Sequence, residues 1–106
     1  MNKYRKVLRL LEQRNWQEME EWLHKDFMYI KETALMNRED HVKKLEKEFA
    51  LKQAINQNKL LHEDNDMMAF KHIVTKKNGE KFRVTQIQLY KDGKVWREMS
   101  NAIKIN

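Results

Sequence analysis

Two dipeptides constrain the fold most strongly, because they hold the only two glycines of a 106-residue chain that has no proline. Asn78-Gly79 and Asp92-Gly93 each separate long runs in which apolar and polar side chains alternate. Asn-Gly and Asp-Gly favour the positive φ angles of two-residue β-hairpin turns. Residues 67–77, 80–91 and 94–105 are therefore predicted to form three consecutive antiparallel strands.

Two-residue turns also fix which side chains share a face, since a shift of one residue turns every side chain of a strand to the opposite face. Counting from the turns pairs His72 with Thr85, and Glu98 with Ile87. One face of the predicted sheet then carries Met68, Phe70, His72, Val74, Arg83, Thr85, Ile87, Leu89, Trp96, Glu98, Ser100 and Ala102. The opposite face is also substantially apolar.

The N-terminal half shows the periodicity of helices, interrupted by one short strand. Asn15 stands three residues before Glu18, which resembles a capping box, and Asn37 can cap a later helix. Residues 26–30 are aromatic and β-branched, which is typical of a strand. The predicted elements before the three strands are, in order, helix 3–14, a short helix from residue 16, strand 26–30, a helix after Asn37, and strand 55–62.

Chain length and composition predict a single domain over residues 1–106, since a chain of this size buries enough surface for one core. The absence of cysteine excludes disulfides, thiol nucleophiles, zinc–thiolate sites and iron–sulfur clusters. No cofactor is predicted, because both glycines lie in turns and leave no phosphate-binding loop. No metal site is predicted, because the four histidines lie on four different predicted elements.

The formal charge of +6 comes from 22 basic and 16 acidic residues spread along the chain. This mixture favours a solvated surface over nucleic-acid binding, because no aromatic residues interleave with the basic clusters. No apolar run has the length of a membrane span, and the N-terminus lacks the apolar core of a signal peptide. A cytoplasmic protein without membrane or nucleic-acid partners is therefore expected.

The two apolar faces of the predicted sheet need two covers. Three short helices can cover only one of them, so the outer face is expected to meet a second copy of the chain. The sequence thus predicts a homodimer through the outer sheet face. An interaction module whose sheet face binds a different protein is the alternative.

The order of the elements resembles the nuclear transport factor 2-like (NTF2-like) superfamily, in particular its small bacterial SnoaL-like domains. The local patterns that carry the resemblance are Trp22-Leu23-His24-Lys25-Asp26-Phe27, Asn37-Arg38-Glu39-Asp40, His72-Ile73-Val74-Thr75 with Asn78-Gly79, and Asp92-Gly93-Lys94-Val95-Trp96-Arg97-Glu98. The resemblance spans nearly the whole chain. It implies a cone-shaped α+β fold in which a curved, mainly antiparallel sheet wraps around three helices and encloses an apolar cavity. The superfamily hosts several enzymes, transport factors and many proteins without known chemistry, so the resemblance predicts a fold and leaves the activity open.

The resemblance places the face with His72 and Glu98 on the cavity side. Glu98 could polarise the imidazole of His72 as a general base, or both side chains could simply satisfy polar groups of the core. Steroid-isomerase chemistry does not carry over, because Lys31 and Glu32 stand where those enzymes place a general-base aspartate. The predicted pocket wall consists of Trp16, Trp22, Tyr29, Phe70, Thr85, Ile87 and Trp96.

Three functions follow from these observations. The leading one is binding of a small, largely apolar molecule in the cavity. The second is an enzyme of the isomerase, dehydratase or cyclase type that uses His72 as general base with Glu98 in support. The third is the protein-interaction module that acts through the sheet face.

Overall fold

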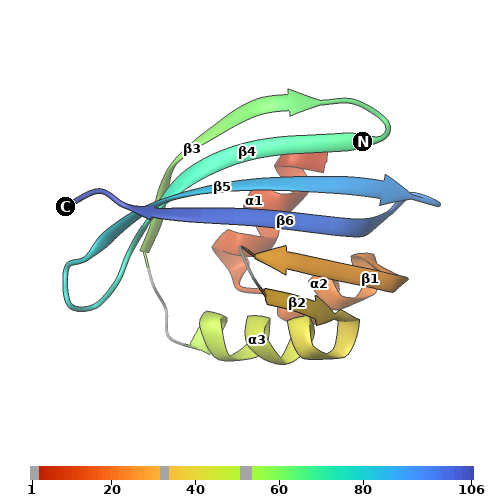
Figure 1. Ribbon diagram of the computed structural model, residues 1–106, viewed down its shortest axis with the longest axis horizontal. Helices are drawn as coiled ribbons and strands as arrows, with labels where there is room; N and C mark the ends of the chain where they lie inside the picture. Colours follow the sequence, from red (N-terminus) through yellow and green to blue (C-terminus); the bar gives the residue numbers. More distant parts are fainter. Residues whose placement is uncertain (1–2, 32–33, 51–53) are drawn as a thin grey trace.

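A computed structural model describes residues 3–31, 34–50 and 54–106. Within these ranges the fold has three helices and one six-stranded sheet, as the α+β prediction requires (Figure 1). The elements are α1 (Lys3–Gln13), α2 (Trp16–Trp22), β1 (Leu23–Lys31), β2 (Ala34–Asn37), α3 (Arg38–Ala50), β3 (Ala54–Glu63), β4 (Met67–Thr75), β5 (Lys81–Lys91) and β6 (Lys94–Lys104).

The sheet is mixed and curved, with strand order β2-β1-β6-β5-β4-β3. Neighbouring strands are antiparallel except β1 and β6, which are parallel. In Figure 1, α1 and α2 lie behind the sheet, and α3 runs beside β2. The three-helix, mainly antiparallel arrangement expected of an NTF2-like fold is confirmed.

The predicted caps form at two helices. The side-chain oxygen of Asn15 accepts a hydrogen bond from the backbone N–H of Glu18 at 3.1 Å. Asn37 accepts one from the N–H of Asp40 at 2.9 Å. Each cap satisfies a backbone donor that lacks a partner within its helix, which is worth about 1 kcal/mol.

The core lies between the helices and the inner face of the sheet. Val7 and Leu10 of α1 are fully buried, and they join Phe27, Met68 and Phe70 in one cluster. Burying a side chain of this size contributes roughly 1.5–3 kcal/mol. The cluster therefore fixes α1 on the sheet and with it one wall of the enclosed space.

The expected register of the first hairpin is wrong by one residue. The N–H of Gly79 bonds to the carbonyl of Lys76, and the N–H of Lys76 bonds to the carbonyl of Glu80, so that the turn holds three residues instead of two. Gly79 has a φ of +88°, the left-handed conformation that such three-residue turns place at their last position. His72 consequently pairs with Val84 and not with Thr85. Thr85 and Ile87 lie on the outer face, and Gln86 and Gln88 face inward.

The second hairpin has the expected two-residue turn, in which Lys91 pairs with Lys94 across Asp92-Gly93. A β-bulge follows, because Tyr90 pairs with Val95 whereas Leu89 pairs with Arg97, which leaves Trp96 as the extra residue. Glu98 therefore pairs with Gln88, not with the expected Ile87. The bulge lets both Val95 and Glu98 be buried on the inner face.

Candidate functional site

A cavity of about 770 Å³ lies between the helices and the inner face of the sheet. Its closed end is formed by buried side chains, among them Trp22, Phe70, Val95 and Glu98. Its other end is lined by exposed side chains, namely Glu12, Arg14, Asn58 and Lys76. This gradient of exposure places the mouth where the end of α1 approaches β3 and the hairpin of β4 and β5.

The cavity has one apolar wall and one polar wall. Helices α1 and α2 contribute the apolar side chains Val7, Leu8, Leu11, Met19 and Trp22. Opposite them, two cross-strand rows of β1, β6 and β5 contribute polar side chains. The rows are Tyr29, Glu98 and Gln88, and Lys31, Ser100 and Gln86.

Glu98 is the central polar group of the closed end, with only 6% of its surface exposed. The side-chain amide of Gln88 donates to its Oε1 at 2.6 Å, and the hydroxyl of Tyr90 donates to Gln88 Oε1 at 2.6 Å. The other carboxyl oxygen, Oε2, lies 3.5 Å from Nε2 of His41. Burial raises the pKa of Glu98 to about 7, although the hydrogen bond from Gln88 opposes the shift.

His41 of α3 is 4% exposed and lies against the rings of Phe27 and Tyr29, with centroid distances of 4.9 and 4.6 Å. Burial lowers its pKa to about 4, and the nearby charge of Lys44 acts in the same direction. Its imidazole is therefore neutral at pH 7. A carboxyl that titrates near neutrality beside a neutral imidazole can both release and accept a proton.

His72 also lines the cavity, but its surroundings differ from those expected. Burial lowers its pKa to about 4, and its ring lies 5.8 Å from that of Phe70. Within the described residues, no hydrogen bond or ion pair links His72 to Glu98, whose polar contacts are to Gln88 and His41. The residue that sequence reasoning missed is His41. The sequence did carry a signal, because His41, Lys44, Leu45 and Glu48 have the i, i+3, i+4 and i+7 spacing of one side of a helix. All four side chains line the cavity.

Three of the predicted pocket residues line the cavity, namely Trp22, Tyr29 and Phe70. Trp16 packs against the core from outside the cavity lining. Thr85 and Ile87 point to the outer face, because of the three-residue turn. Trp96 lies in the bulge, where the Arg97 guanidinium sits 3.8 Å from its ring. Lys31 lines the cavity, and Glu32 lies outside the described residues.

Across residues 3–31, 34–50 and 54–106, no three His, Asp or Glu side chains gather so that they could hold a metal ion. No helix in these ranges is both long enough and apolar enough to cross a membrane.

Comparison with known proteins found likenesses at the level of structure. No family model and no curated protein sequence matches the chain. A Kribbella flavida crystal structure provisionally named a ketosteroid isomerase superposes with a TM-score of 0.81 at 21% identity, covering 97% of this chain and 76% of that one. An NTF2-like protein of unknown function from Cytophaga hutchinsonii gives 0.68 at 13% identity, covering 92% and 81%. A Xanthomonas campestris protein provisionally named a polyketide cyclase gives 0.71 at 13%, covering 88% and 82%. At these identities the likeness shows a shared fold.

Proposed function

Because the chain has the NTF2-like fold, we propose that it binds a small, largely apolar molecule in its cavity. The observation that carries this proposal is a space of about 770 Å³ with an apolar wall facing a polar one. Small-molecule sites have volumes of this order, and a few polar groups among apolar ones orient the ligand. The apolar surface of α1 and α2 supplies binding energy, and the rows on β1, β5 and β6 supply hydrogen-bonding partners.

A bulky residue in the wall tests this proposal. Val84 lines the cavity, and its neighbour Arg83 is exposed on the outer face. For the neutral aromatic probe 2-naphthamide, we expect Val84→Trp to weaken binding at least roughly tenfold in calorimetric titration, because the indole occupies the site. Arg83→Trp is the matched control and should bind as the parent does. Equal binding by both variants, or no binding by the parent, would contradict the proposal.

We propose a proton-transfer enzyme of the isomerase, dehydratase or cyclase type as the second candidate, with Glu98 as the acid–base residue. Oε1 of Glu98 already accepts a hydrogen bond from Gln88, so the oxygen available for proton transfer is Oε2, which lies beside His41. Oε2 takes a proton from the carbon next to a ligand carbonyl and returns it to the resulting enolate, and no other reactant is consumed. His41 is the group that positions Oε2 in this scheme.

Hydrogen–deuterium exchange separates an enzyme from a binding protein. The parent protein in D₂O should speed exchange at the acidic carbon of 2-tetralone, followed by NMR. Loss of a general base costs typically 10²–10⁴-fold, so Glu98→Gln should lose about that factor. His72→Gln is the comparison variant, and it should retain the activity. Unchanged exchange in Glu98→Gln would overturn the assignment of Glu98.

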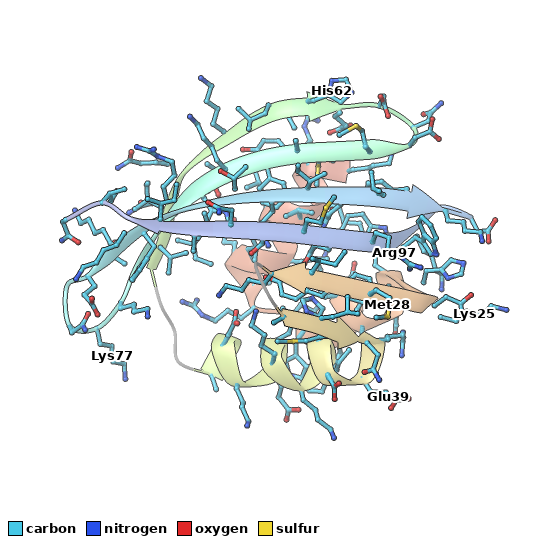
Figure 2. The ribbon with its side chains drawn as sticks, viewed as in Figure 1. Lys25, Met28, Glu39, His62, Lys77 and Arg97 are labelled. Atoms are coloured by element: carbon cyan, nitrogen blue, oxygen red, sulfur yellow. The ribbon has the colours of Figure 1, made fainter. Side chains whose placement is uncertain are left out.

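We also propose that the outer face of the sheet pairs with a second copy of the chain. A row of apolar side chains crosses this face through paired positions of five strands: Leu35, Ile30, Met99, Ile87 and Ala69. Leu35 is 65% exposed and Ile30 is 36% exposed. In Figure 2, Met28 and Arg97, which neighbour this row, lie on the side of the sheet away from α1 and α2. The helices leave this apolar row without a cover, which supports self-association.

Light scattering after size-exclusion chromatography tests the dimer. The parent should elute at micromolar concentration as a particle of twice 13.1 kDa. Ile87→Glu places a charge in the middle of the row and should yield the monomer, whereas Asn78→Glu at the hairpin turn should not. A parent particle of 13.1 kDa would exclude the dimer.

A further inference from the structure

Lysines outnumber the carboxylates that pair with them at the mouth of the cavity, among the described residues. Four lysines lie on the inner side of the sheet or on α3 near this end: Lys31, Lys44, Lys76 and Lys104. Lys44 Nζ lies 3.3 Å from Glu48, and Lys104 Nζ lies 2.8 Å from Glu80. In the part of the chain that the structure describes, Lys31 and Lys76 form no ion pair, although the charge of Lys76 helps to lower the pKa of Glu80, which is paired with Lys104. These four lysines are thus balanced by two carboxylates, Glu48 and Glu80. The mouth therefore keeps positive charge that the protein does not itself neutralise.

Strand alternation explains why these two lysines face the cavity. Lys31 follows Tyr29 on β1 with one residue between them, and both line the cavity. Lys76 continues the inward series of His72 and Val74. Its Nζ lies 4.6 Å from the centre of the Phe82 ring, another lining residue. Charged side chains thus occupy positions that the fold directs toward its interior.

Other charges at the mouth do not reverse this balance. Glu12 and Arg14 at the end of α1 contribute one charge of each sign, and Lys44 and Glu48 form a pair. The net charge of the lining side chains at this end is positive, with Lys31 and Lys76 in excess. Opposite charge at the entrance of a low-dielectric cleft attracts a ligand more strongly than the same charge on an open surface.

The closed end cannot hold an anion. Glu98 and the two histidines are not cations at neutral pH. The lysine nearest to them, Lys44, reaches the Tyr29 hydroxyl at 3.5 Å, but it is already paired with Glu48. A buried charge without a partner is costly, so an ionised group of the ligand has to remain near the lysines. The apolar wall of α1 and the ring of Phe70 receive the remainder of the molecule.

We propose that the ligand is an amphipathic carboxylate, with its carboxylate between Lys31 and Lys76 at the mouth and its apolar body in the closed part of the cavity. This inference rests on the proposed binding function and adds the chemical class of the ligand. The two lysines set specificity for charge, whereas the walls set affinity for the apolar body.

A pair of nearly isosteric probes tests this inference. 2-Naphthoate carries a negative charge at neutral pH, and 2-naphthamide has the same ring system without the charge. The parent should bind the carboxylate more tightly than the amide. In Lys31→Met/Lys76→Met, the affinity for 2-naphthoate should fall roughly tenfold, because two ion pairs near solvent are lost. The affinity for 2-naphthamide should change less than about twofold, since its binding involves no charge.

The control removes two charges close to the mouth without touching the cavity. Lys77 and Lys81 are exposed, and Figure 2 shows Lys77 at the end of the hairpin, away from the body of the protein. Lys77→Met/Lys81→Met should bind both probes as the parent does. Equal affinity of the parent for the two probes, or a carboxylate affinity that Lys31→Met/Lys76→Met leaves unchanged, would overturn the ligand class while leaving the cavity proposal intact. Failure of the parent to bind either probe would overturn both.

Discussion

The polar side chains at the two ends of the cavity differ in burial and in charge. At the closed end, Glu98, His41 and His72 are at most 6% exposed, and burial shifts the pKa of each toward its uncharged form. At the mouth, Lys44 and Lys104 are paired with the carboxylates of Glu48 and Glu80 near solvent. Burial thus favours the uncharged form of the groups at the closed end, whereas the lysines nearer solvent are held by carboxylates. The closed end is suited to proton transfer, and the mouth to charge recognition.

The largest expected effect is the loss of stability when a packed phenylalanine is removed from either end of the cavity. Phe70 at the closed end is 1% exposed, whereas Phe82 near the mouth is half-buried. We expect Phe70→Ala to reduce the free energy of unfolding by about 3–5 kcal/mol, the usual cost of deleting a buried phenylalanine, because a cavity is left behind. Phe82→Ala should cost roughly half as much, since part of its ring already meets solvent. Urea denaturation of the two variants measures the difference, and equal losses would contradict the comparison.

The next effect concerns the pH dependence of stability at the closed end. The pKa of Glu98 is raised to about 7, so between its ordinary value and pH 7 the folded state binds more protons than the unfolded state. Glu98 therefore makes the protein less stable as the pH rises. The pKa values of His41 and His72 are lowered to about 4, so both contribute stability that is lost as the pH falls from 6.5. The two kinds of group act in opposite directions.

Glu98→Gln isolates one of these contributions. The amide keeps the size of the carboxyl and does not titrate, so the variant should gain stability relative to the parent as the pH rises from 4.5 to 7. The gain should reach about 3 kcal/mol and level off above pH 7. Urea denaturation at a series of pH values measures the difference. A difference that stays constant with pH would show that Glu98 titrates normally.

Local signals in the sequence were enough for most of the fold. The two asparagine caps and the alternating strands depend on residues close together in the chain, so eight of the nine described elements were predicted. The prediction of β2 (Ala34–Asn37) failed, because this segment was expected to be a connection before the helix after Asn37. The strand registers were not, because Asn78-Gly79 is compatible with both two-residue and three-residue turns. The bulge at Trp96 depends on packing between strands, and no local sequence pattern predicts it.

The candidate site illustrates how two such errors can cancel. The longer first turn reverses the faces of β5, and the bulge then shifts β6 by one residue, so Glu98 and His72 still share the inner face. Thr85 and Ile87, which lie on β5 between the two irregularities, were assigned to the wrong face. His41 is a polar residue beside the apolar positions Val42 and Leu45 of the predicted helix, so the apolar helical periodicity did not mark it as a pocket residue. The cavity-lining side of α3 is instead centred between His41 and Lys44.

The smallest expected effect lies at the mouth. Lys104 pairs with Glu80 at 2.8 Å, and half of the lysine side chain is exposed, at 52%. Lys104→Met should reduce the free energy of unfolding by less than about 1 kcal/mol, because solvent screens exposed ion pairs, and the loss should shrink further in high salt. Denaturation at low and high salt measures it, with Lys77→Met as a control that removes a charge without a pair. A loss as large as that of Phe70→Ala would contradict the comparison. It would mean that an exposed ion pair at the mouth contributes as much to the free energy of unfolding as a buried ring at the closed end.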